Sequence, residues 1–263
     1  MEEQRSRVPA VADITVSIVS HAHGGLLLEL LADLNATESL RGATVLVTLN
    51  VPSDHVDVSA YPNLRVVPLR NETSRGFARN HNAAFARCTT EWFAVLNPDL
   101  RLPRDPFPSM LALAQQDERI GLVAPVVTDI NGALEDSVRT NLSPLSLLQR
   151  KLRGSTPVSA MIPGEFYWFG GMFMLFRSAA FRELKGFDER FFLYCEDYDI
   201  CARLHLAGYG LRLDTGARVI HNAQRMSHKS IRHLGWHVQS LFRVWLSKPF
   251  WQITFRSMAT ATR

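Results

Sequence analysis

The sequence predicts an α/β fold with a mostly parallel central sheet flanked by helices, and three observations support this prediction. Short β-branched runs alternate with helical patterns through the first third of the chain. The runs end in polar or turn-forming residues, and no internal repeat interrupts the order. Of the 263 residues, 46% are hydrophobic, which is ample for a sizeable core. In such folds ligands bind at the carboxyl ends of the parallel strands.

The individual elements follow from local patterns. Runs of Val, Ile and Leu predict strands at 13–21, 43–50, 64–69, 91–96, 120–127 and 217–221. Stretches that are rich in leucine or begin with polar residues predict helices at 26–34, 76–88 and 196–208. A further helix is predicted to begin at Pro106, with Asp105 as its N-cap. The segment from Asp129 to Gly164 is rich in Ser, Pro, Asn and Arg without periodicity, so we expect a long loop region there. Ordered structure should return at 166–176.

Several classes of protein are excluded by composition. The first twenty residues carry charges of both signs and lack the apolar segment of a secretory signal, so we expect a cytosolic protein. The longest apolar run, in "YWFGGMFMLF", is about half the length that a spanning helix needs. The three cysteines, Cys88, Cys195 and Cys201, are widely spaced, which argues against a disulfide framework or a zinc site. We expect them to be reduced core residues.

The stretch "AVLNPDL" places Asp99 directly after an apolar strand, in a turn shaped by Pro98. This position is the sheet edge at which ligands bind, and hard cations such as Mg²⁺ are often held by one or two carboxylates plus substrate phosphates. Asp99 is therefore a candidate metal ligand. The same residues, Asn97 and Asp99, are equally typical of a simple Asx turn.

The stretch "ETSRGFARNHN" combines cations, a glycine and amides at a helix start. Gly76 permits close backbone approach, Arg75 and Arg79 offer cationic donors, and Asn80 lies at a helix N-terminus that favours anions. These residues fit a pyrophosphate-binding loop. A solvated helix start is the more common explanation of such a cluster.

In "FFLYCEDYDICARLHLAGY", three acids follow an apolar run. Glu196 and Asp197 would lie at a helix N-terminus, where negative charge is favoured for purely structural reasons. The aromatic run before them would also place them at a partly dry rim, where a raised pKa suits a general base. Asp199 and Arg203 are four residues apart on the same helix, and we expect them to pair with each other.

Two further candidates come from the last third of the chain. His221 ends an apolar strand, and a neutral imidazole is a common metal ligand, although a lone histidine there is more often a hydrogen-bonded core residue. Gly170 and Gly171 would let a substrate approach the backbone, and a packing kink explains them equally well.

Together these motifs resemble a known family. In order, "SRGFARNHNAAF", "LNPDL", "WFGGMFMLFR", "GFDERFFLYCEDYDICARLHLAGY" and "VIHN" resemble the inverting family 2 glycosyltransferases of bacterial polysaccharide assembly, which have the Rossmann-like GT-A fold. The strongest likeness is to rhamnosyltransferases that act on lipid-linked precursors. The resemblance covers roughly residues 13 to 245, and the run from Gly186 to Gly208 is highly specific.

The resemblance implies roles for the candidate residues. Asp99 and His221 would hold Mg²⁺ or Mn²⁺ near the diphosphate. Asp197 would be the catalytic base, supported by Glu196. The remaining candidates divide into the donor side, with Ser20, Asn50, Arg75, Gly76, Asn80 and Asn97, and the acceptor side, with Gly170 and Gly171.

The implied reaction is a single inverting displacement, with one base for the acceptor hydroxyl and one cation for the leaving diphosphate. The donor would be dTDP-L-rhamnose and the acceptor a polyprenyl-diphosphate-linked saccharide, in bacterial surface polysaccharide or lipopolysaccharide O-antigen biosynthesis. The alternatives are another hexose from a UDP- or GDP-sugar, or a catalytically silent assembly subunit.

Two departures from the family pattern concern the nucleotide pocket. The first strand usually ends in Thr-Tyr-Asn, where this chain has Ser20-His21-Ala22, and the second usually ends in Asp-Asn, where it has Leu49-Asn50. The acid that commonly contacts the nucleobase is therefore missing. The identity of the base stays open for this reason.

The C-terminal part is basic. From Thr215 to Arg263 there are eight Lys or Arg and no acid, so we divide the chain into a main domain, 1–225, and a helical tail, 226–263. Leu234, Val238, Leu241 and Trp245 would share one helical face, as in helices that lie on the cytoplasmic face of the inner membrane. The alternatives are packing on its own domain or on a second copy in a homodimer. Nucleic-acid binding fits poorly, because the bases are interleaved with apolar residues.

Overall fold

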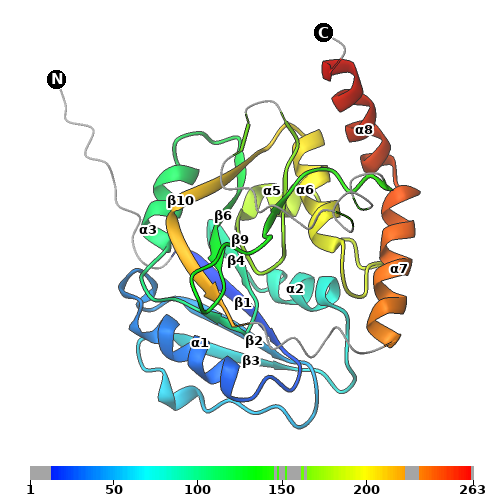
Figure 1. The fold of residues 1–263 in the computed structure, drawn as a ribbon. Helices are drawn as coiled ribbons and strands as arrows, with labels where there is room; N and C mark the ends of the chain where they lie inside the picture. The colour runs from blue at the N-terminus through cyan, green and yellow to red at the C-terminus, as the bar shows by residue number, and fades with distance from the viewer. Residues whose placement is uncertain are drawn as a thin grey trace, which may run out of the picture.

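A computed structural model describes residues 13–144, 147, 152, 161–162, 165–222 and 231–261 of the chain, with the backbone alone at 231, 232 and 257–261. Its centre is an eight-stranded sheet in the order β3-β2-β1-β4-β9-β6-β10-β5 (Figure 1). The strands of this sheet are β1 (Ile14–Ser20), β2 (Thr44–Leu49), β3 (Arg65–Arg70), β4 (Trp92–Leu96), β5 (Leu100–Arg101), β6 (Ile120–Thr128), β9 (Phe173–Arg177) and β10 (Gly210–His221).

The sheet is mostly parallel, as the sequence predicts. The pairs β3-β2, β2-β1, β1-β4 and β6-β10 are parallel, whereas β9 and β5 run antiparallel to their neighbours. Because β9 is antiparallel to both β4 and β6, these two strands share one direction. The carboxyl ends of β1, β2, β4, β6 and β10 therefore meet at one edge of the sheet.

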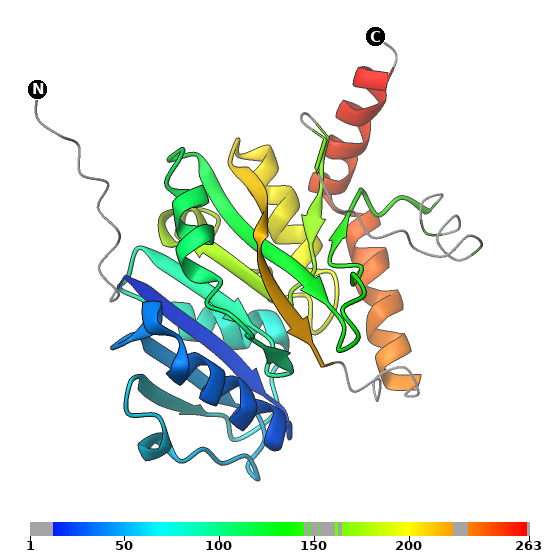
Figure 2. The same ribbon diagram turned by 60° about the vertical axis from the view of Figure 1, so that its left-hand side comes forward.

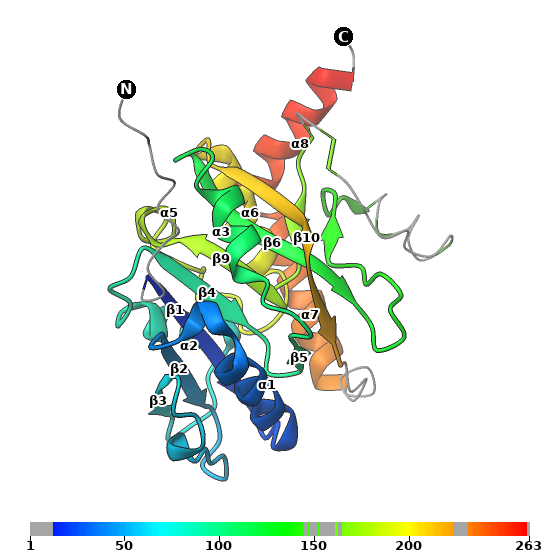
Figure 3. The same ribbon diagram turned by 90° about the vertical axis from the view of Figure 1, so that its left-hand side faces the viewer.

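Helices cover both faces of the sheet (Figures 2 and 3). The helices are α1 (Gly25–Ala36), α2 (Phe77–Phe85), α3 (Phe107–Ala114), α5 (Ser178–Glu183), α6 (Glu196–Leu206), α7 (Ile231–Trp245) and α8 (Lys248–Ala261), with short 3-10 turns η1 (Glu38–Leu40) and η2 (Val58–Ala60). Core residues of α1 and α3 pack with one face, and those of α2, α5, α6 and α8 with the other.

The pleat explains how one strand serves both cores. In β4, Trp92, Ala94 and Leu96 point into the α1–α3 core, and the alternate residues Phe93 and Val95 point into the α2–α6 core. All five are buried, so β4 reads as a continuous apolar run, as is typical of a parallel strand covered on both sides.

A second, two-stranded sheet has one strand in the predicted loop region and the other in the segment where we expected order to return. Strand β7 (Val138–Arg139) pairs with β8 (Trp168–Phe169), and the Trp168 indole donates to the Thr140 carbonyl at 2.8 Å. The predicted loop region from Asp129 to Gly164 therefore contains a short strand, β7, that we did not predict. Most of the later part of that region lies outside the described residues.

The final strand is also longer than predicted. It begins at Gly210 instead of Ala217, and its register against β6 shifts between Asp214 and Arg218. Asp214, Thr215 and Gly216 are turn-forming residues and lie in this irregularity. They interrupt the strand pattern of the sequence, which is why the first half of the strand was not predicted.

The tail forms two helices where the sequence pattern suggested one. The break falls at Leu246–Ser247, and Pro249 occupies the first turn of α8, the helical position where a missing N–H costs nothing. Both helices pack on the main domain, since Val244, Phe250 and Ile253 are buried in the α2–α6 core. The boundary that we placed at 225/226 lies outside the described residues.

The prediction about the cysteines is confirmed. Cys88, Cys195 and Cys201 are free thiols and all three are buried. Among the helices of the described residues, none is long and apolar enough to span a membrane.

Candidate functional site

The polar candidates gather at the edge of the sheet where the parallel strands end. Asp99 lies in the turn between β4 and β5, and His221 is the last residue of β10. They meet because β5 turns back and pairs antiparallel with the end of β10, which sets His221 opposite Leu100. The Asn222 amide also donates to the Asp99 carbonyl at 2.8 Å.

His221 lies between two carboxylates. Its Nε2 is 3.2 Å from Asp99 Oδ2, and its Nδ1 is 2.8 Å from Glu135 Oε2. Burial alone would lower the pKa of His221, but the hydrogen bonds and charges of Asp99 and Glu135 outweigh it and raise the pKa to about 9. The other Asp99 oxygen, Oδ1, is buried and has no hydrogen-bond partner among the described residues.

Asp197 reaches the same edge through β9. The Asn97 amide donates to the Met172 carbonyl at 2.8 Å, and the neighbouring Gly171 amide donates to Asp197 Oδ2 at 3.0 Å. The Tyr198 amide donates to the second oxygen, Oδ1, at 2.8 Å. The N-terminus of α6 is thus tied to the turn that carries Asp99.

Glu196 and Asp197 are adjacent in the chain but differ in their surroundings. Burial raises the pKa of Glu196 well above its usual range, and the Asp197 charge raises it further. Burial also raises the pKa of Asp197, but the Arg139 charge and the backbone N–H donors oppose that shift. Glu196 Oε2 has no hydrogen-bond partner among the described residues. These surroundings favour the charged form of Asp197 more than that of Glu196.

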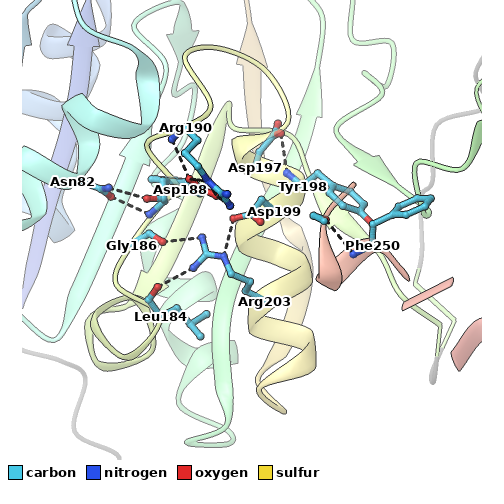
Figure 4. Close-up of polar contacts among 12 residues, drawn as sticks. Asn82, Leu184, Gly186, Asp188, Arg190, Asp197, Tyr198, Asp199, Arg203 and Phe250 are labelled. Carbon is cyan, nitrogen blue, oxygen red and sulfur yellow. Dashed lines mark hydrogen bonds and ion pairs between the residues drawn. The ribbon is translucent and has the colours of Figure 1, made fainter. Parts of the chain in front are cut away.

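The helix that carries these acids is fixed by Asp199 and Arg203, as predicted. Arg203 Nε lies 2.7 Å from Asp199 Oδ2, and its two Nη atoms donate to the Leu184 and Gly186 carbonyls at 2.8 Å (Figure 4). Asn82 of α2 holds the next stretch, because it bonds both the amide and the carbonyl of Phe187. The loop before Asp197 is therefore braced from two helices.

On the donor side, the amides that we predicted to bind nucleotide have partners within the protein. Asn50 donates to the Arg75 carbonyl at 2.9 Å and accepts from its N–H at 2.9 Å. Asn80 also donates to the Arg75 carbonyl, and Asn71 joins Asn50 to Asn80. Both predicted amides are buried, whereas Arg75 is exposed. Asn50 and Asn80 thus position the Arg75 backbone.

Gly76 allows a close backbone contact, as predicted, but the group that approaches it is the Phe192 carbonyl of the protein itself. A Cβ built at this position would lie 2.4 Å from the Phe192 carbonyl oxygen. The next residue, Phe77, donates its N–H to the same oxygen at 2.9 Å. The donor-side loop and the loop before Asp197 are consequently in backbone contact.

The two glycines that we predicted on the acceptor side have different neighbours. Gly171 lies beside Asp197, since a Cβ at position 171 would be 3.8 Å from Asp197 Cβ. Gly170 donates its N–H to the Ser137 carbonyl at 2.8 Å, next to β7. Ser20, at the end of β1, is buried, and its Oγ has no hydrogen-bond partner among the described residues. Asn97 is half-buried beside Asp99.

Sequence reasoning missed three residues of the site: Glu135, Arg139 and His237. Glu135 and Arg139 come from the segment without periodicity, where nothing in the pattern distinguishes them. Arg139 opposes the upward pKa shift of Asp197, and its guanidinium lies 4.8 Å from the centre of the Trp168 ring. His237 comes from α7, which we treated as a separate tail, although its ring lies 5.1 Å from that of Tyr194 in the loop before Asp197.

The mostly parallel sheet flanked by helices, with the candidate residues gathered at one edge, has the GT-A type of fold. Solved structures agree on the fold. The mannosyltransferase PcManGT from Pyrobaculum calidifontis, in complex with GDP-Man and Mn²⁺, aligns at a TM-score of 0.62 and 17% identity, over 93% of this chain and 68% of its own. S. aureus TarS 1-349 in complex with UDP-GlcNAc aligns at a TM-score of 0.65 and 13% identity. This alignment covers 94% of this chain and 73% of the TarS chain.

Residues 54–184 match the family model described as glycosyl transferase family 2, and the chain belongs to that family. It is 28% identical over 255 residues to N-acetylglucosaminyl-diphospho-decaprenol L-rhamnosyltransferase of Mycobacterium tuberculosis, covering 87% of this chain and 82% of the relative. It is also 27% identical to rhamnosyltransferase WbbL of Escherichia coli K12, and that match covers 88% of this chain and 91% of the relative. The protein is a rhamnosyltransferase-like glycosyltransferase.

Proposed function

We propose that this glycosyltransferase is metal-dependent and inverting, and that it moves L-rhamnose from dTDP-L-rhamnose to a polyprenyl-diphosphate-linked saccharide in bacterial surface polysaccharide, such as O-antigen, biosynthesis. One observation carries the proposal: β9 and β5 bring Asp197 and the Asp99–His221 pair to the same edge of the sheet. A base on one side and a cation site on the other are what a single displacement at a sugar diphosphate needs.

The residues present fit a divalent cation. Asp99 Oδ1 is buried and has no hydrogen-bond partner among the described residues, and His221 Nε2 lies 3.2 Å from the other oxygen of the same carboxylate. The described residues contain no group of three or more His, Cys, Asp or Glu side chains that could hold a metal. One or two carboxylates completed by diphosphate oxygens are typical of Mg²⁺. His221 would become a second ligand only by losing the proton that Asp99 and Glu135 favour. When bound, such a cation would neutralise the charge of the leaving diphosphate.

Asp197 takes the role of the base. Its half-buried carboxylate accepts from two backbone N–H groups, and these donors and the Arg139 charge favour the charged form against the effect of burial. An acceptor hydroxyl that enters beside Gly171 can give its proton to this carboxylate as its oxygen attacks the anomeric carbon. Glu196 supports Asp197 by keeping a proton of its own, which avoids two adjacent buried charges.

The donor and the acceptor are proposed from the relatives. Both curated relatives are rhamnosyltransferases by name, and one acts on a decaprenyl-diphosphate-linked N-acetylglucosaminyl group. Asn50 stands where the family usually has an Asp-Asn ending, and its amide is engaged by Arg75 and Asn71. Recognition of the base therefore falls to other groups, and a UDP- or GDP-sugar is the competing donor.

A lipid-linked acceptor places the enzyme at a membrane surface, and the tail is suited to that. On α7 and the turn after it, Leu234, Val238, Phe242 and Leu246 are spaced four residues apart and are all exposed, Leu246 at 84%. We call these four residues the lipid-facing ridge. The face that we predicted was partly wrong, because Leu241 and Trp245 pack against the core.

The charge around the ridge fits the cytoplasmic face of the inner membrane. The sequence from Thr215 onward contains bases and no acid, and each base near anionic lipid contributes about 1 kcal/mol to binding. The competing use of the same face is a homodimer contact.

Product analysis tests the proposal. The purified enzyme is given N-acetylglucosaminyl-diphospho-farnesol, one of dTDP-L-rhamnose, UDP-sugars or GDP-sugars, and Mg²⁺, Mn²⁺ or a chelator, and products are read by mass spectrometry. We expect transfer from dTDP-L-rhamnose that stops in the chelator. Transfer that persists in the chelator contradicts the metal requirement, and preference for another nucleotide contradicts the donor.

The base assignment has its own test. Asp197→Asn keeps the size of the side chain but cannot accept the proton, so turnover should fall at least about a hundredfold while the dissociation constant for the donor is retained. Turnover and donor binding are measured on the same preparation. Near-normal turnover by this variant would remove Asp197 from the mechanism.

A further inference from the structure

Helix α7 is not only an outer tail, because its inner face lines the site. Ser240 Oγ donates to the Leu193 carbonyl at 3.0 Å, and Arg243 donates to the Arg190 carbonyl. Both contacts hold α7 against the loop that leads to Asp197. Figure 1 shows α7 running beside this loop and α6.

The side chains between α7 and the loop form an aromatic cluster. The Phe192 and Trp236 rings are 4.7 Å apart with their planes 34° from parallel, and His233 packs edge-on against Trp236 at 5.0 Å. The Tyr194 hydroxyl is 2.9 Å from His233 Nδ1, and its ring lies 5.1 Å from that of His237. We call Phe192, Tyr194, His233, Trp236 and His237 the α7 platform.

The platform is partly open to solvent. Phe192 is 40% exposed, and His237 is exposed while Tyr194, His233 and Trp236 are half-buried. The Phe192 carbonyl accepts from the Phe77 N–H, so the backbone of Phe192 is fixed while part of its ring stays exposed.

The platform also reaches the base. The ring of Tyr194 lies 5.1 Å from that of His237, and Tyr194 is only three residues before Asp197 in the chain. At its other end the platform meets the N-terminus of α2 through the Phe192 carbonyl. It therefore extends from the donor-side loop to the carboxylate that would take the acceptor proton.

We propose that the α7 platform binds the acceptor sugar: the packed Phe192–Trp236 pair offers an aromatic face to the apolar side of a pyranose ring, and His233 and His237 bond its hydroxyls. This inference rests on the proposed function and names the part of the enzyme that holds the acceptor. The C–H groups of a pyranose face carry slight positive charge, which complements the negative face of an aromatic ring. Imidazole nitrogens both donate and accept, as hydroxyl recognition requires.

The position of the platform also suits an acceptor with a lipid tail. The lipid-facing ridge occupies the outer side of the same helix whose inner side carries Trp236 and His237. The platform and the ridge thus belong to one helix, so a sugar bound at the platform would be held close to a membrane surface on which the ridge lies.

Steady-state kinetics of Trp236→Ala test this proposal, with N-acetylglucosaminyl-diphospho-farnesol as the acceptor and dTDP-L-rhamnose as the donor. We expect the acceptor KM to rise about tenfold, the size of one lost stacking contact, while the donor KM stays unchanged. Trp236→Phe keeps an aromatic face and should recover most of the loss. Gln239→Ala, at an exposed position on the same helix, is the control and should match the wild type.

The outcomes separate the two proposals. If the wild type transfers sugar but Trp236→Ala keeps the wild-type acceptor KM, the platform is refuted and the proposed function stands. If Trp236→Phe is as impaired as Trp236→Ala, aromatic stacking is refuted. If the wild type binds the donor but makes no product with this acceptor, the proposed function fails and the platform with it. Circular dichroism of each variant confirms that α7 is folded.

Discussion

At the scale of single residues, the site depends on two adjacent carboxyl groups with different surroundings. Asp197 receives N–H groups from Gly171 and Tyr198, while one oxygen of Glu196 has no partner among the described residues. Hydrogen-bond donors favour a charged carboxylate and burial without them favours the neutral acid. The charged form is therefore favoured at Asp197 more than at Glu196, which is the difference that the proposed base role requires.

This difference makes a prediction for Glu196. Glu196→Gln resembles the neutral acid, so turnover should fall less than about tenfold, in contrast with Asp197→Asn. The turnover of both variants is measured at pH 7.5 with saturating donor. A loss from Glu196→Gln as large as that from Asp197→Asn would show that Glu196 acts in its charged form.

His81 makes stability depend on pH. It is buried on α2, with Nδ1 2.8 Å from Ser17 Oγ, and burial lowers its pKa to about 3 from the usual 6.5. Between these values the unfolded chain binds one more proton than the folded chain. The stability contribution is therefore complete above pH 6.5 and declines as the pH falls, by about 2 kcal/mol between pH 7 and pH 5.

Urea unfolding at pH 5 and pH 7 measures this effect. His81→Gln removes the titrating group, so the free energy of unfolding of the variant should lose about 2 kcal/mol less than that of the wild type on acidification. Other titrating groups are common to both proteins and cancel in the comparison. Equal acid sensitivity of the two proteins would contradict this role for His81.

The sequence was informative about residues whose chemistry stands out locally. Asp99, His221 and Asp197 each end or follow an apolar run, and the structure brings them to one edge. Asn50 and Asn80 also stood out, but an amide motif cannot reveal that its hydrogen bonds are used within the protein. Arg139 and Glu135 were not predicted, because their proximity to the site depends on long-range pairing of β7 and on the end of β10.

At the scale of elements, Arg203 is the residue on which the N-terminal loop of α6 depends. It joins Asp199 to the Leu184 and Gly186 carbonyls, which fixes the start of the loop that ends at Asp197 (Figure 4). Burial raises the pKa of Asp199 in spite of the Arg203 charge, so removal of Arg203 leaves an acid with little solvation.

Arg203→Met should therefore lower the free energy of unfolding by about 3 kcal/mol, measured by urea denaturation. Arg41→Met is the matched control, because Arg41 and Glu38 form an exposed pair with side chains 58% and 82% accessible, and its loss should cost less than about 1 kcal/mol. Similar losses in the two variants would mean that the Arg203 contacts contribute no more than a surface pair.

The alternation of strands and helices was predictable because each element in the first half has a clear local pattern. The elements that differ from prediction are those set by distant partners. The two residues of β7 are a strand only because β8 pairs with them, and β10 begins early because β6 accepts its irregular first half. The break between α7 and α8 was locally marked by Pro249, and a continuous apolar pattern obscured it.

At the scale of the whole molecule, the described tail helices combine an outer apolar ridge with an inner face that lines the site. Leu234, Phe242 and Leu246 are exposed on the outside, while Ser240 and Val244 are buried on the inside. Binding to a membrane would then fix the orientation of the sheet edge as well as the location of the enzyme.

Charges on the ridge should disturb membrane binding alone. Phe242→Asp and Leu246→Asp should each weaken binding to phosphatidylglycerol vesicles about tenfold or more in co-sedimentation, because a carboxylate at the interface is repelled by anionic lipid. Leu28→Asp, at an exposed position on α1, is the control. If these variants change the sedimentation coefficient in lipid-free buffer instead, the ridge is a contact between two copies of the chain.

The contact between Gly76 and Phe192 has a consequence for building new enzymes from this one. Any side chain at position 76 would collide with the Phe192 carbonyl, so the segment before α2 and the loop before α6 have to match each other in shape. A chimera that takes only one of these two segments from a related transferase, to change the sugar that is accepted or delivered, would inherit a steric mismatch between them. The two segments should be exchanged together, as one module.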